Sequence, residues 1–385
     1  MASIRKRTWA YKGIEKSAWV VDYFDQGKVK RRKTFATKKQ AVDWSTTALH
    51  EVKQGIHTPA SASVTILRAG ELWIEECEAE GLEFSTIRQR RQHLYIHINK
   101  HLGAVRLSDL KTPSIYQFDG QLRAAGISLA MRRKVITSLK TLLSFAQKQA
   151  LVAQNVALPV KIKRDDREEK GPLREGVDYP SRAQMKTLMD KATPRWRPLL
   201  VTAMFTGMRA SELRGLPWSN VALDEGVIHV RQRADAWGKI GKPKSKAGKR
   251  DIPLPPIVVN TLREWMLACP KRDTGKKDEN GKPVMVLDLV FPNGRGHAES
   301  LQNIYKRFWN PVQQESGLPH FGFHALRHVA ASLFIAYLDW TPKRVQEVMG
   351  HSSITVTYDT YGHLFKDKDA DRDAMKKIEA AIVAA

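Results

Sequence analysis

The sequence predicts a mainly α-helical protein with small β-sheets, divided into more than one domain. Its 385 residues exceed the length of one ordinary domain, and a hydrophobic content of 42% is enough for real cores. Apolar residues recur at helical spacing through most of 64–158, whereas β-branched and aromatic runs are short. These strand-like runs fall in two places, near the N-terminus and within 226–255.

The first predicted domain, 1–57, is a three-stranded sheet followed by one helix. It is basic, with 13 Lys and Arg against 5 Asp and Glu. Residues 19–24 and 29–35 read as strands around a turn at 25–27, and Thr37 caps a helix through Trp44. The exposed face would carry Lys30, Arg31, Arg32 and Lys33. Such strands can lie in a DNA major groove, although a solvated basic edge strand would look the same.

The second predicted domain, 58–160, is a helical bundle preceded by a Pro- and Ser-containing linker. A long apolar periodicity over 129–151 gives one of its helices. Cations follow the same helices, which indicates either a solvated face or a DNA-binding one. They are Arg88, Arg90, Arg91, Arg132, Arg133, Lys134 and Lys140.

A charged linker at 161–178 leads into the third predicted domain, 179–385, which is mixed and mostly helical. It contains two strand-like runs, 226–231 and 250–255, separated by a polar turn. Residues 270–284 are charged and contain two Gly and two Pro, and they are expected to form a mobile loop insertion.

The charge favours a polyanionic partner. Sixty-four Lys and Arg against 40 Asp and Glu give a net charge of +24, which attracts nucleic acid. No apolar run reaches the ~18 residues of a membrane span, and no signal peptide is expected. Cys77 and Cys269 have neither metal spacing nor a disulfide framework. We therefore expect a nucleic-acid-binding protein of a reducing cytoplasm.

Six short matches carry the chemistry. They are Thr-Gly-Met-Arg-Ala-Ser-Glu-Leu (206–213), a lysine-rich turn (242–250), His-Ala-Leu-Arg-His (324–328), Met-Gly-His-Ser-Ser (349–353), Tyr358 and Tyr361. Together they supply two arginine forks for a phosphate, imidazoles, an ammonium group and a nucleophilic hydroxyl. That set suits phosphoryl transfer without a metal or other cofactor.

In order and spacing, these matches resemble the tyrosine site-specific recombinases, and within them the phage integrases. The likeness covers nearly the whole chain. It implies an arm-type DNA-binding domain at 1–57, a core-DNA-binding domain at 58–160 and a catalytic domain at 179–385. It also implies that Arg209 and Arg327 bind the phosphate, that His324 and His351 assist, and that Glu212 orients Arg209.

The resemblance leaves two choices between neighbouring residues. Counting back from Pro253 favours Lys244 over Lys246 as the lysine that protonates the departing 5′ oxygen. Tyr361 lies ten residues after His351 and Tyr358 lies seven, and the family spacing of nine or ten favours Tyr361 as the nucleophile. His328, four residues after His324, is expected to pack or cap, and a zinc site built on this pair is disfavoured by the Arg between them.

The implied activity is site-specific DNA recombination through a 3′-phosphotyrosyl intermediate, integrating and excising a mobile element such as a prophage or viral genome. The implied partners are core and arm sites in double-stranded DNA and a homotetramer on two duplexes. An excision factor and a host DNA-bending protein are left open. Two alternatives remain: a non-catalytic DNA-binding regulator on the same scaffold, and a type IB topoisomerase-like enzyme. The DNA-contact set is expected to be Lys30, Arg31, Arg32, Lys33, Arg88, Arg91, Arg132, Arg133 and Lys134.

Overall fold

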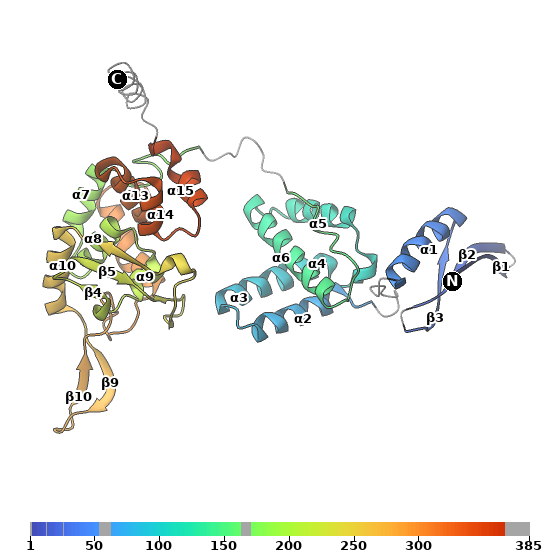
Figure 1. Ribbon diagram of the computed structural model, residues 1–385, viewed down its shortest axis with the longest axis horizontal. Coiled ribbons are helices and arrows are strands. Elements are labelled where there is room, and N and C mark those ends of the chain that lie inside the picture. Colours follow the sequence, from blue (N-terminus) through green and yellow to red (C-terminus); the bar gives the residue numbers. More distant parts are fainter. Residues whose placement is uncertain (1, 13, 26, 54–62, 163–170, 366–385) are drawn as a thin grey trace, which may run out of the picture. The chain divides into compact units, whose positions relative to one another are not determined.

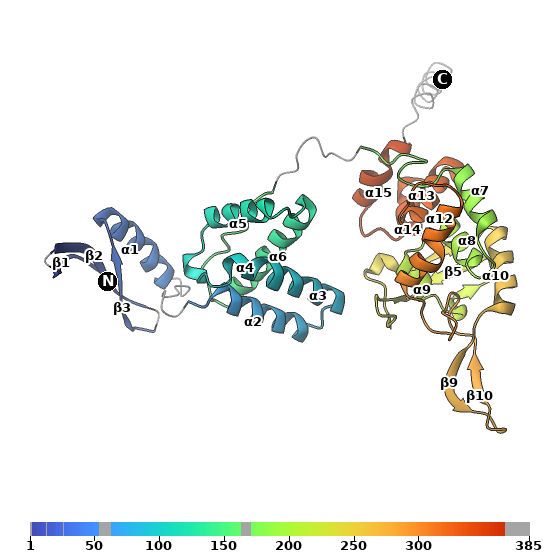
Figure 2. The ribbon, with the colours of Figure 1, turned by 180° about the vertical axis from the view of Figure 1, so that it is seen from behind.

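The computed structural model describes residues 2–12, 14–25, 27–53, 63–162 and 171–365 (Figures 1 and 2). The chain divides into two compact units, Met1–Glu169 and Lys170–Ala385. The linker residues 54–62, residues 163–170 of the predicted linker 161–178, and residues 366–385 lie outside the described residues. Within the described part, no helix combines the length and apolarity needed to cross a membrane.

The first unit begins with an antiparallel sheet, in the order β1 (Ser3–Tyr11), β2 (Ile14–Phe24), β3 (Lys30–Phe35), followed by α1 (Lys38–Lys53). Trp44 of α1 packs its ring against Tyr23 and Phe35, at centroid distances of 5.1 and 5.5 Å. One face of the sheet is thereby fixed to the helix. The predicted N-terminal sheet and helix are confirmed.

The rest of this unit is helical. Its elements are α2 (Ile66–Ala79), α3 (Phe84–Gln92), η1 (His93–Ile98), α4 (Asn99–Leu102), η2 (Leu107–Asp109), α5 (Thr112–Ala124) and α6 (Leu129–Lys148). Thr65 and Ser128 cap α2 and α6 by accepting a hydrogen bond from a backbone N–H of the first turn. Every third or fourth residue of α6 is buried, including Val135, Leu139 and Leu142, so the predicted periodicity forms the core.

The second unit is built around α8 (Arg197–Thr206), which is buried nearly all round and packs against α10 (Pro256–Ala268) and α13 (Ala325–Leu338). The remaining helical elements are α7 (Arg182–Lys191), α9 (Ala210–Arg214), η4 (Trp218–Asn220), α11 (Leu301–Ile304), η6 (Tyr305–Trp309), α12 (Asn310–Glu315), α14 (Pro342–Met349), α15 (Ile354–Tyr361) and η7 (Gly362–Phe365).

A three-stranded antiparallel sheet lies beside these helices, in the order β4 (Val221–Ala222), β5 (Val227–Val230), β8 (Arg250–Pro253). The β5–β8 pairing matches the two strands predicted from the sequence. Between them, β6 (Arg233–Ala234) pairs with β7 (Ile240–Gly241), and η5 (Lys246–Gly248) leads back into β8.

The prediction of a loop over 270–284 is wrong, because most of these residues belong to paired strands. These residues form an antiparallel hairpin of β9 (Arg272–Lys277) and β10 (Pro283–Val286), which projects from the second unit (Figure 1). The charged and Gly-containing stretch 278–281 is only its turn, which is closed by a hydrogen bond from the Asp278 backbone N–H to the Lys282 carbonyl. Thr274 and Val284 belong to the paired strands, and the Thr274 hydroxyl donates a hydrogen bond to the Val284 carbonyl at 2.9 Å.

Candidate active site

Arg209 is brought to the site by a left-handed glycine. Helix α8 ends at Thr206, Gly207 has φ +61°, and Arg209 is the residue that precedes α9. A Cβ on Gly207 would come within 2.7 Å of Met349 Sδ and 3.1 Å of Ala330 Cβ. Only a residue without a side chain therefore lets this junction approach α13 and α14 so closely.

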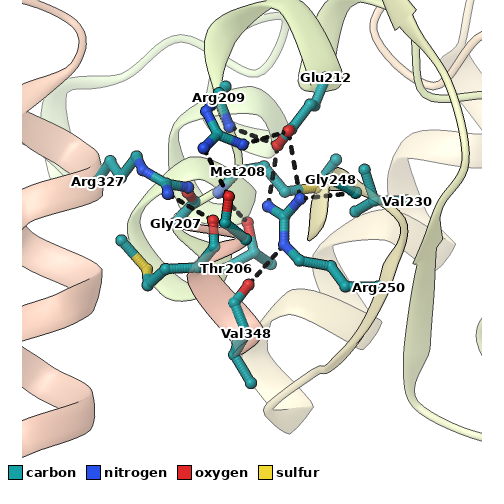
Figure 3. Close-up of polar contacts among 12 residues, drawn as sticks. Thr206, Gly207, Met208, Arg209, Glu212, Val230, Gly248, Arg250, Arg327 and Val348 are labelled. Atoms are coloured by element: carbon teal, nitrogen blue, oxygen red, sulfur yellow. Dashed lines mark hydrogen bonds and ion pairs between the residues drawn. The ribbon is translucent and has the colours of Figure 1, made fainter. Parts of the chain in front are cut away.

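Glu212 lies beneath Arg209 and is 2% exposed. It accepts hydrogen bonds from the Arg209 backbone N–H at 2.9 Å and from Arg209 Nη1 at 2.8 Å (Figure 3). Burial alone would favour the neutral acid, but Arg250 and Arg209 outweigh it and hold the pKa of Glu212 below its ordinary value. The carboxylate is therefore charged at neutral pH and fixes the direction of the Arg209 guanidinium.

Arg250 is a site residue that the sequence reasoning missed. Its side chain is 5% exposed and points into the same cluster (Figure 3), where it donates to Glu212 at 2.9 and 3.2 Å. It also donates to the carbonyls of Val348 at 2.5 Å and Gly248 at 3.1 Å. A signal was available, because Arg250 shares the buried face of β8 with Ile252, and a cation at such a position requires a partner.

Arg327 occupies the buried side of α13 and is 3% exposed. It donates to the Gly207 carbonyl at 2.5 Å and to the carbonyl of Met349. Arg209 donates to the next carbonyl, Gly350, at 2.7 Å. Burial, then Arg209 and Arg250, lower the pKa of Arg327 to about 9, which leaves it charged at neutral pH. Three guanidinium groups thus meet around the 207 and 348–350 backbone.

Gly350 allows the end of α14 and the loop that follows it to approach the three guanidinium groups closely. Its φ is +66°, and a Cβ there would lie 2.9 Å from the Ala247 carbonyl oxygen and 3.0 Å from Arg250 Nη1. The positive φ ends α14 and turns His351 into the cluster. This glycine therefore lets the end of α14 pack closely against the connection from β7 to β8, residues 242–250, which is called the lysine-bearing hairpin below.

Both predicted histidines belong to the cluster, and both are neutral at pH 7. His351 is 7% exposed, and its Nδ1 lies 2.9 Å from Thr357 Oγ1. Desolvation, followed by Arg327, Arg209 and Arg250, lowers the pKa of His351 to about 3. The His324 side chain is exposed on one side, yet desolvation by the surrounding protein, followed by the effects of His328 and Arg327, lowers its pKa to about 4. Each imidazole can offer one N–H to an anion.

The two tyrosines of α15 are in opposite environments. Tyr361 is 2% exposed, whereas Tyr358 is 52% exposed and lies beside Phe365. The Tyr361 hydroxyl is 2.8 Å from His328 Nδ1, and its ring lies nearly parallel to that of His351 at 6.2 Å. Burial raises the pKa of Tyr361, with Arg327 opposing the shift. His328, expected to pack or cap, lies in contact with the predicted nucleophile.

The predicted lysines are carried by the connection between β7 and β8. Lys244 and Lys246 are both exposed, and Lys246 begins the short η5 turn. Gly248 and Arg250, which follow, are buried in the cluster. The hairpin is thus anchored at its base and presents its cations outward, and the geometry leaves the choice between the two lysines open.

The predicted DNA-contact residues of the first unit divide into two groups. Some are committed to ion pairs: Arg31 with Asp25 at 2.7 Å, Arg32 with Asp22 at 2.8 Å, Arg132 with Asp119 at 2.7 Å, and Arg91 with Glu78. The others are Lys33, which lies over the Trp44 ring, and the exposed Lys30, Arg88, Arg133 and Lys134. Arg132 is the least exposed of the four ion-paired arginines, since its side chain is only 11% exposed.

Neither the histidines nor the cysteines assemble a metal site in the part of the chain that is described. No group of three or more His, Cys, Asp or Glu side chains there is placed to hold an ion. His324 and His328 are in contact, with ring centroids 5.3 Å apart and nearly perpendicular planes. Cys77 and Cys269 are separately buried, one in each unit.

Comparison with known proteins gives concordant matches. Residues 181–368 match the Phage integrase family. The tyrosine recombinase XerC-like protein of Caldanaerobacter subterraneus subsp. tengcongensis is 24% identical over 360 residues, covering 88% of this chain and 90% of that protein.

Among solved structures, the Tn1549 transposon integrase in complex with a circular intermediate DNA aligns with a TM-score of 0.64 at 20% identity, covering 82% of this chain and 100% of that one. A lambda integrase tetramer bound to a Holliday junction aligns with a TM-score of 0.56 at 18% identity, covering 90% and 92%. The fold described above is shared with these structures.

Proposed function

We propose that this chain is an integrase of the phage integrase family, a tyrosine recombinase that cuts and rejoins DNA strands through a 3′-phosphotyrosyl bond at Tyr361, and the match of residues 181–368 to that family supports this. Its role is to integrate and excise a mobile element, such as a prophage, at short DNA sites. One observation carries the proposal. Segments 207–212, 248–250, 324–328 and 348–361 converge on one cluster of three guanidinium groups, three imidazoles and a buried phenol.

Two of the three guanidinium groups bind the scissile phosphate. Arg209 and Arg327 donate to its non-bridging oxygens, and His324 and His351 add neutral N–H donors. The pentavalent transition state carries more negative charge than the phosphodiester, so these donors act most strongly at that point. Loss of one such donor costs roughly 10²–10³ in rate. Glu212 and Arg250 act one step away, by holding Arg209 and the 348–350 carbonyls.

Tyr361 supplies the nucleophile. Its oxygen bonds to phosphorus as the bond to the 5′ oxygen breaks, and Lys244 protonates the departing oxygen. The phosphotyrosyl bond conserves the energy of the phosphodiester. A 5′ hydroxyl from another strand can therefore reverse the step and join the partner DNA without a nucleotide cofactor.

Double-stranded DNA is the proposed partner, with four protomers exchanging strands between two duplexes. The net charge of +24 supports the first part. The lambda integrase tetramer on a Holliday junction, which shares this fold, supports the second. The exposed cations of the first unit contact core and arm sites. The reaction takes place on DNA in the bacterial cytoplasm.

A trapping assay tests this proposal. The substrate is a duplex spanning the junction between the mobile element and its host chromosome, nicked so that the fragment released by cleavage diffuses away. Wild type, Tyr361→Phe and Tyr358→Phe are compared on a denaturing gel without added metal. A protein–DNA band lost only in Tyr361→Phe is expected. DNA binding without any covalent band would instead favour a regulator, and relaxation of supercoils without strand exchange would favour a topoisomerase.

A further inference from the structure

His328 stands between the proposed phosphate clamp and the proposed nucleophile. It follows Arg327 directly on α13, one turn after His324, and is half-buried. Its Nδ1 lies 2.8 Å from the Tyr361 hydroxyl, and the two rings are 5.8 Å apart at an angle of 59°. His351 lies in the loop after α14, and its ring stacks against the Tyr361 ring. The phenol is thus held between two imidazoles, only one of which reaches its oxygen.

The Tyr361 phenol has a proton that must leave when its oxygen attacks phosphorus. An ordinary phenol has a pKa of about 10. Burial raises that of Tyr361 further, Tyr179 adds to the shift, and Arg327 opposes it. The phenolate is therefore scarce at neutral pH in the DNA-free protein, and attack needs a proton acceptor within hydrogen-bond distance.

His328 is in the protonation state that can accept. Desolvation and then Arg327 lower its pKa, while Asp178 partly counters them. The ring of His324 contacts the ring of His328. His324 is itself neutral at pH 7 and does not stabilise a positive charge on His328. A neutral imidazole with its hydrogen on Nε2 presents the Nδ1 lone pair to the phenol, which is the arrangement that the 2.8 Å contact allows.

We propose that His328 is the proton acceptor for Tyr361, an assignment that rests on the proposed recombinase function. As the Tyr361 oxygen bonds to phosphorus and the bond to the 5′ oxygen breaks, the phenol proton passes to His328 Nδ1. The 5′ oxygen takes its proton from Lys244. In the joining step the incoming 5′ hydroxyl returns a proton to Lys244, and His328 returns its proton to the leaving phenol. No atom or charge is left unaccounted for.

The test compares His328→Asn with His297→Asn, which makes the same replacement at an exposed histidine of the same unit. Single-turnover cleavage of the nicked duplex is measured at a series of pH values. We expect His328→Asn to bind DNA and to unfold thermally like wild type, but to cleave roughly 10²–10⁴-fold more slowly. With no acceptor, its rate should climb about tenfold per pH unit with the phenolate fraction, more steeply than that of wild type.

Two chemical substitutions separate a proton acceptor from a merely structural residue. A duplex with sulfur in place of the bridging 5′ oxygen has a leaving group that needs no proton. It should restore cleavage by Lys244→Met but not by His328→Asn. Fluorinated tyrosine at position 361 ionises more readily, and should restore part of the rate lost in His328→Asn.

The outcomes are distinct. If wild type forms no covalent complex, the proposed function fails. If wild type does so and His328→Asn cleaves equally fast, only the assignment of His328 fails. A slow His328→Asn that keeps the wild-type pH profile and gains nothing from fluorotyrosine would also overturn it, because that pattern indicates a packing defect.

Discussion

Glu212 and Arg250, 38 residues apart in the sequence, form a buried two-point ion pair with donor–acceptor distances of 2.9 and 3.2 Å. The same Glu212 carboxylate holds Arg209, and the same Arg250 guanidinium holds the Val348 carbonyl. One pair thereby fixes the start of α9, the base of the lysine-bearing hairpin and the end of α14. The groups proposed to bind phosphate depend on it for their positions.

Replacing Arg250 should therefore destabilise the second unit far more than replacing a surface arginine. Arg250→Met leaves the Glu212 charge buried with one cation fewer, and breaking such a pair costs about 3–5 kcal/mol. Arg263→Met is the control, because Arg263 pairs with the exposed Asp224 and such pairs contribute roughly 0–1 kcal/mol. Urea unfolding of the full chain, followed by hydrogen exchange in peptides from α8, measures both. Equal losses would contradict the role given to Arg250.

Gly350 should tolerate alanine less well than a glycine of the same backbone conformation in open space. Gly350→Ala forces a Cβ to within 2.9 Å of the Ala247 carbonyl, at φ +66°. Gly317 has φ +64° and nothing within 4 Å, so Gly317→Ala reports only the left-handed conformation, about 1–2 kcal/mol.

The difference between the two alanine variants measures the steric term. We expect the larger loss of unfolding free energy in Gly350→Ala, together with less covalent complex, since the Gly350 carbonyl contacts Arg209. If Gly317→Ala loses as much on both counts, the close approach of Gly350 to the hairpin contributes nothing.

The second unit should lose stability in acid, in part through His351. Its pKa is about 3 when folded and near 6.5 when unfolded, so the unfolded state binds a proton first as the pH falls. The contribution of His351 to stability is therefore complete above pH 6.5 and is lost progressively down to about pH 3. His351→Asn keeps a hydrogen-bonding group near Thr357 and cannot titrate in this range. Its free energy of unfolding should fall less steeply with pH over that window, and identical slopes would contradict this.

Arg132 and Arg133 should respond differently despite being neighbours. Arg132→Gln breaks the shielded pair with Asp119 and should lower stability with little change in the salt dependence of DNA binding. Arg133→Gln removes an exposed cation and should reduce the slope of log affinity against log salt by about 1 for one lost phosphate contact. Salt titrations of DNA binding with both variants check this, and a reversed pattern would place the DNA on the other side of α6.

The sequence predicted what local patterns control. The apolar period of α6 and the strands that became β5 and β8 follow from rules acting over a few residues. The contacts of Arg250 with Glu212 and of His328 with Tyr361 join segments 38 and 33 residues apart, so no local pattern specifies them. The sequence likewise does not distinguish exposed cations from paired ones, and the pair of Arg132 with Asp119 is evident only in the structure.

The choice of nucleophile is tested most directly by locating the covalent bond. The complex trapped on the nicked duplex is digested with protease and nuclease, and tandem mass spectrometry identifies the residue that carries the nucleotide. The buried Tyr361, beside His328 and His351, should carry it through a 3′ phosphate. A nucleotide on the exposed Tyr358, or one attached through its 5′ phosphate, would contradict the central claim.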